Sequence, residues 1–282
     1  MASCRMKLRL PRNRSLGPGL VTLGAGLIGE AAEQLADMTR TPVKSVHRTR
    51  VALKQARSTL RLLEKAGAIW AIMPRYRLAH LGGLMSAARE RAVTLALADK
   101  LSRKVRGRER RVAVLLAPRE PRVVPPDFEQ IRLALLRESR EIGLAPPPVI
   151  APAQLRHLLR RSLERATSRQ REAVIRSTNE SMHEWRKAVI VLRDQTRLAA
   201  SRWPQGAGVA HPLLVRLARQ LGRRGDLLLL LSRLQQLRVP AVLKPARRSL
   251  LARLEKQREQ ATLTALLRWL RLVRRLVRLL DE

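Results

Sequence analysis

Residues 45–63 read SVHRTRVALKQARSTLRLL and predict a helix with separate basic and apolar faces. At about 100° per residue, the basic side chains fall within an arc of about 80° and extend for roughly 20 Å along the helix axis. They are His47, Arg50, Lys54, Arg57 and Arg61. The apolar face comprises Val46, Leu53, Ala56, Leu60 and Leu63. Because the stretch contains no acidic residue, the basic row suits a linear polyanion.

A related pattern begins at Ser181, where residues 181–199 read SMHEWRKAVIVLRDQTRLA. The gap-free identities between the two stretches are Ser45/Ser181, His47/His183, Arg50/Arg186, Ala52/Ala188, Arg57/Arg193, Arg61/Arg197 and Leu62/Leu198. The same offset pairs apolar residues of the next expected helix: Leu81/Leu217, Met85/Leu221, Val93/Leu229 and Leu95/Leu231. We therefore interpret the chain as an internal duplication.

The two stretches resemble the CHAD domain (conserved histidine α-helical domain), whose pattern is His-x-x-Arg-x-x-x-Lys-x-x-Arg on the first helix of each of two repeats. The first copy matches in full, at His47, Arg50, Lys54 and Arg57. The second copy matches at His183, Arg186 and Arg193 and has Ile190 at the lysine position. The resemblance extends from about residue 20 to the C-terminus. It implies an all-helical module that binds inorganic polyphosphate and catalyses no reaction.

The charge of the chain points independently to an anionic partner. Its 282 residues include 58 Lys and Arg against 22 Asp and Glu, a formal net charge of +36. A hydrophobic content of 45% supplies a core and argues against a disordered basic tail. A folded body this basic repels itself, and an anion would relieve that repulsion. Arginine outnumbers lysine, which suits bidentate contact with phosphate oxygens.

The duplication predicts an all-α fold of two tandem helical-bundle repeats, with about four helices each, packed around a basic groove or channel. We expect a basic flexible arm at residues 1–19, a first repeat at 20–176 and a second repeat at 177–282. Proline-rich connectors are expected at 118–126 and 145–152, because proline interrupts helices.

Periodicity, capping residues and breaks predict the individual helices. Thr41 and Ser177, the latter in a capping box with Glu180, are the expected N-caps of the two motif helices. The last helix is expected to break near Ala261. The expected ranges are 21–38, 42–67, 75–104, 127–142, 153–176, 178–202, 213–237 and 246–280.

The side chains of the candidate site have roles that follow from their chemistry. Arg50, Arg57, Arg61, Arg186, Arg193 and Arg197 would clamp phosphate oxygens. Lys54 and Lys187 would add point charge, and His47 and His183 would donate hydrogen bonds. Further wall residues would be Arg160, Arg165 and Arg271.

Motifs for catalysis or metal binding are missing from the sequence. The five histidines are scattered without ligand spacing, and the chain has no G-x-S-x-G, P-loop or H-E-x-x-H motif. The E-x-E-x-K motif of the triphosphate-processing CYTH domain, which often accompanies CHAD domains, is also missing. We therefore predict a binding module with no catalytic residue, metal or cofactor.

Two other partner classes remain open. Nucleic-acid backbones would accept the same basic rows, although an aromatic content of 2% leaves few platforms for base stacking. A membrane surface is suggested by the basic amphipathic stretch at residues 268–280, which is also typical of a terminal helix packed in a bundle. The chain has no stretch of about 18 consecutive apolar residues, so the sequence predicts no transmembrane helix. The sequence gives no oligomeric state.

The sequence also indicates the cellular compartment in which the protein is expected. Cys4 is the only cysteine, so an intrachain disulfide is impossible and a reducing cytoplasm is expected. The basic start followed by uncharged residues 19–29 superficially resembles a secretory signal, but glycines weaken the hydrophobic stretch and Glu30 interrupts it. The family resemblance adds an expected association with polyphosphate granules.

Overall fold

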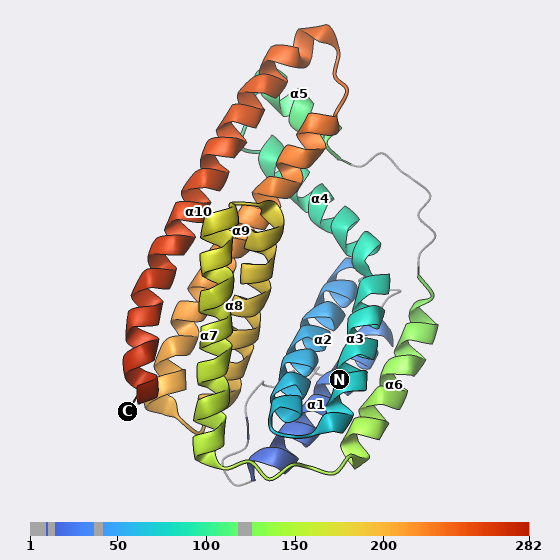
Figure 1. Ribbon diagram of the computed structural model, residues 1–282. Helices are drawn as coiled ribbons and strands as arrows, with labels where there is room; N and C mark the ends of the chain where they lie inside the picture. Colours follow the sequence, from blue (N-terminus) through green and yellow to red (C-terminus); the bar gives the residue numbers. More distant parts are fainter. Residues whose placement is uncertain (1–9, 11–14, 37–41, 118–125, 282) are drawn as a thin grey trace. The chain divides into compact units, whose positions relative to one another are not determined.

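The computed structural model describes residues 10, 15–36, 42–117 and 126–281, and every regular element in them is helical (Figure 1). The predicted all-α class is confirmed. The α-helices are α1 (Leu16–Ala36), α2 (Pro42–Lys65), α3 (Ile72–Leu84), α4 (Ser86–Ser102), α5 (Gly107–Leu115), α6 (Phe128–Leu144), α7 (Pro152–Arg176), α8 (Asn179–Ala199), α9 (Val209–Gln236) and α10 (Lys244–Asp281). Short helical turns are η1 (Ile69–Ala71), η2 (Pro204–Gly208) and η3 (Ala241–Leu243). No described helix combines the length and the apolar character needed to cross a membrane.

The chain divides into two compact units, each with residues from both halves of the sequence. Unit 1 is drawn from Met1–Ser86, Pro125–Val215 and Leu272–Glu282, and unit 2 from Ala87–Val124 and Arg216–Arg271. This division does not test the expected repeat boundary between residues 176 and 177, which stays a prediction.

The core of unit 1 is built on the apolar helix α1. Its residues Leu20, Leu27 and Ile28 are fully buried. Hydroxyl groups tie two neighbouring helices to its backbone. Thr49 Oγ1 of α2 donates to the Ala31 carbonyl at 3.2 Å, and Ser139 Oγ of α6 donates to the Ala25 carbonyl at 2.9 Å. Buried hydrogen bonds of this kind fix how α2 and α6 lie against α1.

The start of α1 differs from the sequence prediction. The helix begins at Leu16, which is buried, rather than near residue 21. A Cβ atom at Gly17 would collide with the Pro148 carbonyl oxygen, so glycine permits a close backbone approach there. Trp70 Nε1 donates to the Pro146 carbonyl at 3.0 Å, a second contact to the segment between α6 and α7.

The end of α2 has a glycine-capped arrangement in which Gly67 has φ of +102°. The Ala68 N–H donates to the Leu63 carbonyl at 2.9 Å, and the Gly67 N–H donates to the Glu64 carbonyl at 3.1 Å. This pair of bonds is the Schellman motif, which satisfies carbonyls left without helical partners. The predicted glycine stop is confirmed. The predicted Thr41 cap lies outside the described residues.

The single helix expected at residues 75–104 is two helices, so that prediction was wrong. Met85 lies between α3 and α4 with φ of −87° and ψ of 6°, outside the helical region. Its side chain is fully buried, so core packing overrides the helical periodicity of the flanking sequence. The break coincides with the boundary after Ser86, where unit 1 gives way to unit 2.

Unit 2 has its own apolar core, formed by parts of α4, α5, α9 and α10. The sequence predicted no helix between residues 104 and 127, whereas the structure has helix α5 starting at Gly107. Glu109 holds this helix in place, because it accepts from Ser249 Oγ at 2.7 Å and pairs with Arg253 Nη1 at 3.2 Å.

Of the two expected proline-rich connectors, the structure describes mainly the second. Residues 118–125, most of the first, lie outside the described residues. Residues 146–151 of the second have no regular structure, as expected. Helix α6 occupies most of the expected range, and its N-cap Asp127 accepts from the Gln130 N–H at 2.9 Å.

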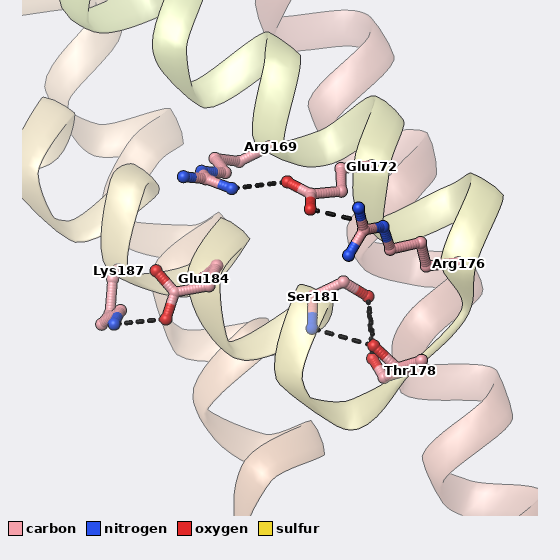
Figure 2. A network of polar contacts seen from close by, with 7 residues as sticks. All are labelled: Arg169, Glu172, Arg176, Thr178, Ser181, Glu184 and Lys187. Atoms are coloured by element: carbon pink, nitrogen blue, oxygen red, sulfur yellow. Dashed lines mark hydrogen bonds and ion pairs between the residues drawn. The ribbon is translucent and has the colours of Figure 1, made fainter.

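The N-cap of α8 is Thr178, so the prediction of Ser177 was wrong (Figure 2). Ser177 has a left-handed backbone with φ of 51°, and its N–H donates to the Ala173 carbonyl at 3.1 Å. That conformation ends α7, whereas an N-cap has extended backbone. Thr178 has extended backbone, and its Oγ1 accepts from the Ser181 N–H at 3.1 Å.

Three other helix boundaries also differ from their predictions. Helix α8 ends at Ala199 rather than near residue 202. Helix α9 begins at Val209 rather than Leu213 and contains Pro212 in its first turn. Helix α10 runs through Ala261 without the expected break, because Ala261 is buried within it.

The seven identical pairs of the two motif stretches have matching environments. Ser45/Ser181, Ala52/Ala188 and Leu62/Leu198 are buried, and His47/His183 is exposed. The three arginine pairs are all partly buried. Equal sequence positions therefore face equal surroundings in α2 and α8, as expected of duplicated helices.

Replacing Gly67 should test the cap of α2. Gly67→Ala should lower the free energy of unfolding by about 1–2 kcal/mol, because a Cβ is strained at this positive φ. Urea denaturation measures the change. Gly83→Ala is the matched control, because its Cβ would meet nothing within 4 Å and alanine favours the helix. Equal effects of the two changes would contradict the assignment.

Candidate anion-binding site

The basic row lies on the side of α2 that turns away from the core. Ala56, Leu60 and Leu63 of the opposite face are fully buried. His47 and Lys54 are exposed, whereas the arginines of the row, Arg50, Arg57 and Arg61, are partly buried. The predicted separation of the basic and apolar faces is thus observed in unit 1.

A first cavity of about 200 Å³ lies between α2 and α3. Its cationic wall consists of Arg50, Lys54 and Arg57, and the facing wall includes Gly82, Gly83 and Ser86. Arg50 Nη1 donates to the Gly82 carbonyl and, at 3.1 Å, to Ser86 Oγ. These bonds orient the Arg50 guanidinium at the cavity wall.

Arg57 also lines this cavity. Its Nε is buried and forms no hydrogen bond with any residue that the structure describes. Burial, followed by repulsion from Arg75, lowers the pKa of Arg57. Arg75 itself is bonded to Glu64, with 2.8 Å between Nε and Oε2. Arg57 therefore has a buried donor that an anion entering the cavity would satisfy.

A second cavity, of about 180 Å³, is lined by α2, α7 and α8. Its cationic side chains are Arg61, Lys65, Arg161 and Arg165. The sequence analysis named Arg61 and Arg165 but missed Lys65 and Arg161. Each missed residue is four positions from a named one on the same helix, and this spacing could have indicated them.

The cations of the second cavity act on one another. Burial lowers the pKa of Arg61 most, and repulsion from Arg165 and then Arg75 lowers it further, against an opposing effect of Glu64. Lowering of the pKa by neighbouring cations means that an anion bound nearby would be stabilised.

The second motif copy, on α8, is partly neutralised by its own acids. Arg193 contacts Asp194 Oδ1 through Nε at 2.9 Å and through Nη2 at 2.6 Å. Asp194 is buried, which raises the pKa of its carboxyl group against the opposing effect of Arg193. Lys187 forms an ion pair with Glu184. The corresponding positions on α2 carry no acid, so the two copies differ as anion sites.

The ion pairs continue onto the neighbouring helix α7, as Figure 2 shows. Glu172 accepts from Arg169 Nη1 at 2.5 Å and pairs with Arg176 Nε at 3.5 Å. Beside this network Glu184 turns toward Lys187. The start of α8 therefore combines cations with internal counter-ions.

Helices α2 and α8 bring the two motif copies close together at Lys54. Ser58 Oγ of α2 donates to the Val191 carbonyl of α8 at 3.3 Å. The charge of Lys54 contributes to lowering the pKa of both His183 and Asp194. The exposed ends of the two motifs therefore share one electrostatic environment.

Partial desolvation contributes most to lowering the pKa of His183, followed by repulsion from Lys187 and Arg186, while Glu184 opposes them. The imidazole therefore favours its neutral form at neutral pH, with one N–H available to donate a hydrogen bond.

The remaining predicted residues are distributed over both units. Arg186 and Arg197 are partly buried on α8. Arg160 lines a third cavity of about 390 Å³, together with Arg171, Val273 and Val277. Arg271 is exposed in unit 2, so it is not a wall residue of the unit 1 cavities.

Metal ligands are not gathered anywhere in the described ranges, where no group of three or more His, Cys, Asp or Glu side chains could hold an ion. The basic cavities thus remain the candidate site.

Comparison with known families shows to which family the chain belongs. The model of the CHAD domain matches residues 26–235, most of the chain and both motif helices. The chain belongs to the CHAD domain family. The matched range includes His47 and His183 and most of both units. No curated protein matches the sequence.

The charges around His183 predict how its titration responds to substitution. Lys187→Gln should raise the pKa of His183, because it removes a neighbouring cation, and Glu184→Gln should lower it, because it removes the opposing acid. Proton NMR of the imidazole over a pH series measures both. Arg176→Gln, the same loss of charge at a residue outside these neighbours, is the control. Shifts in the reverse directions would contradict this description.

Proposed function

We propose that this CHAD domain protein binds inorganic polyphosphate, without catalysis, through the basic face of α2 and the adjoining motif of α8. The observation that carries the proposal is that the row from Arg50 to Arg61 lines two cavities, while the acids nearest to it are engaged elsewhere. The family supports the class of ligand, because CHAD domains are associated with polyphosphate.

The chemistry of α2 fits a linear chain of phosphates. Successive cations lie three or four residues apart, which is roughly 5–6 Å along the axis. An anion in the first cavity would accept from the buried Arg57 Nε and offset its repulsion with Arg75. Several such contacts on one polymer act together, so long chains should bind far more tightly than single phosphate ions.

The two motif copies would contribute unequally. On α2, Lys54 and His47 are exposed beside the arginines and can approach phosphate oxygens. On α8, Arg193 and Lys187 would have to exchange Asp194 and Glu184 for the ligand, which reduces the net gain. Ile190 supplies no charge at the position of Lys54. The α2 copy therefore carries most of the affinity in this proposal.

Nucleic acid is the competing ligand, because its backbone carries the same phosphate charge. The cavities described above present cations, apolar side chains and small residues, with no aromatic side chain on which a base could stack. This composition favours a ligand without bases. In cells, the proposed activity would recruit the protein to polyphosphate granules, and a fluorescent fusion would lose that localisation when Lys54, Arg57 and Arg61 are replaced.

Competition binding should test the proposed ligand and its site. At near-physiological salt, long-chain polyphosphate should displace a labelled probe at lower concentration than RNA or duplex DNA. The variant K54Q/R57Q/R61Q should lose about 1,000-fold or more in affinity, because it removes three charge-assisted contacts that contribute about 1.5 kcal/mol or more each. Added salt should weaken binding linearly on a log-log plot, with a smaller slope for the variant.

The matched control is R137Q/R140Q/R156Q, which removes three exposed arginines of unit 1 outside both cavities. Circular dichroism should show that both variants fold. Equal losses in the two variants, or equal affinity for all three polymers, would make the protein a generic polyanion binder. Shortening of the polyphosphate during incubation, seen by gel electrophoresis, would overturn the non-catalytic assignment.

A further inference from the structure

The second cavity differs in construction from the first. Three helices line it, and its apolar lining consists of Leu62, Leu158, Ala188 and Val191. The first cavity lies between α2 and α3 and reaches Ser86 at the start of α4. The two cavities therefore share α2 and differ in the helices that face it.

The polar lining of the second cavity is strongly cationic. Arg61, Lys65, Arg161 and Arg165 contribute to it, and no acidic residue does. None of the four forms a hydrogen bond or ion pair with a residue in the described ranges. Their positive charges therefore converge on a small volume that no acidic side chain lines.

Gln195 provides an independent sign of a missing ligand. Its side chain lines the cavity and is 1% exposed, and its Oε1 forms no hydrogen bond with any described group. Buried polar atoms are nearly always satisfied. A half-turn of the terminal amide would put its NH₂ group at that place, where it would donate to an anionic oxygen.

The row of cations on α2 ends at this cavity. Arg61 follows Arg57 of the first cavity by about 6 Å along the axis, and Lys65 is the last residue of the helix. A phosphate chain lying along α2 would therefore reach its end here.

We propose that the second cavity binds the terminal phosphoryl group of a polyphosphate chain, an inference that rests on the proposed function. A terminal group has three unshared oxygens and approaches two negative charges near neutral pH, like a phosphate monoester. An internal phosphate has two such oxygens and one charge. Four cations and an amide donor match the terminal group better, so the cavity distinguishes chain ends from chain interiors.

The experiment compares polyphosphate of one defined length with free ends against the same polymer with both ends capped as phosphoramidates. Capping removes a charge and an oxygen from each end and leaves the interior unchanged. Wild-type protein should bind the free-ended polymer about tenfold more tightly, equivalent to one lost charge-assisted contact. The variant R161Q/R165Q should bind both polymers alike, at the affinity of wild type for the capped one.

Two variants provide the controls. R156Q/R171Q has the same loss of charge at exposed positions of α7 outside this cavity and should keep the preference for free ends. K54Q/R57Q should lower the affinity for both polymers by the same factor, because these residues line the first cavity. Equal binding of capped and free-ended polymer by wild type would overturn the terminal-group assignment. Failure to bind either polymer would instead overturn the proposed function.

Discussion

The burial of one face of α2 is the constraint on which the site depends. A row of like charges along a helix is self-repelling, and an isolated helix of this sequence would gain little from forming. Its apolar face, fixed to α1 by packing and by the bond from Thr49 to the Ala31 carbonyl, supplies the stabilisation that holds the cations in line. Repulsion is therefore retained in the folded protein, and it appears as the lowered pKa values of Arg57 and Arg61.

The two motif copies differ in their electrostatics although the burial of their matching residues is the same. In α8, Arg193 and Lys187 are paired with Asp194 and Glu184, at positions where α2 has Ser58 and Arg48. An internal counter-ion lowers the repulsion within α8 and also lowers the free energy available from an external anion. The protein thus combines one strongly repelled basic face, on α2, with one that is partly compensated, on α8.

Features with a local cause could be predicted from the sequence. The amphipathic period of α2, the stop at Gly67 and the all-helical class depend on neighbouring residues alone. The break at Met85 could not be predicted, because it arises when a distant core takes up a side chain within an otherwise helical pattern. The second cavity could not be predicted either. It exists only where α2, α7 and α8 meet, so Lys65, Arg161 and Gln195 look like ordinary surface or core residues until the chain is folded.

The irregular segment between α6 and α7 is fixed at two points, by the Trp70 indole on the Pro146 carbonyl and by the close passage of the Pro148 carbonyl over Gly17. Irregular surface segments usually tolerate insertions and deletions. This one should not, because a change in its length would separate it from both contacts and disturb the start of α1. Among relatives of this chain, those in which this segment has the same length should therefore also have a small residue at position 17.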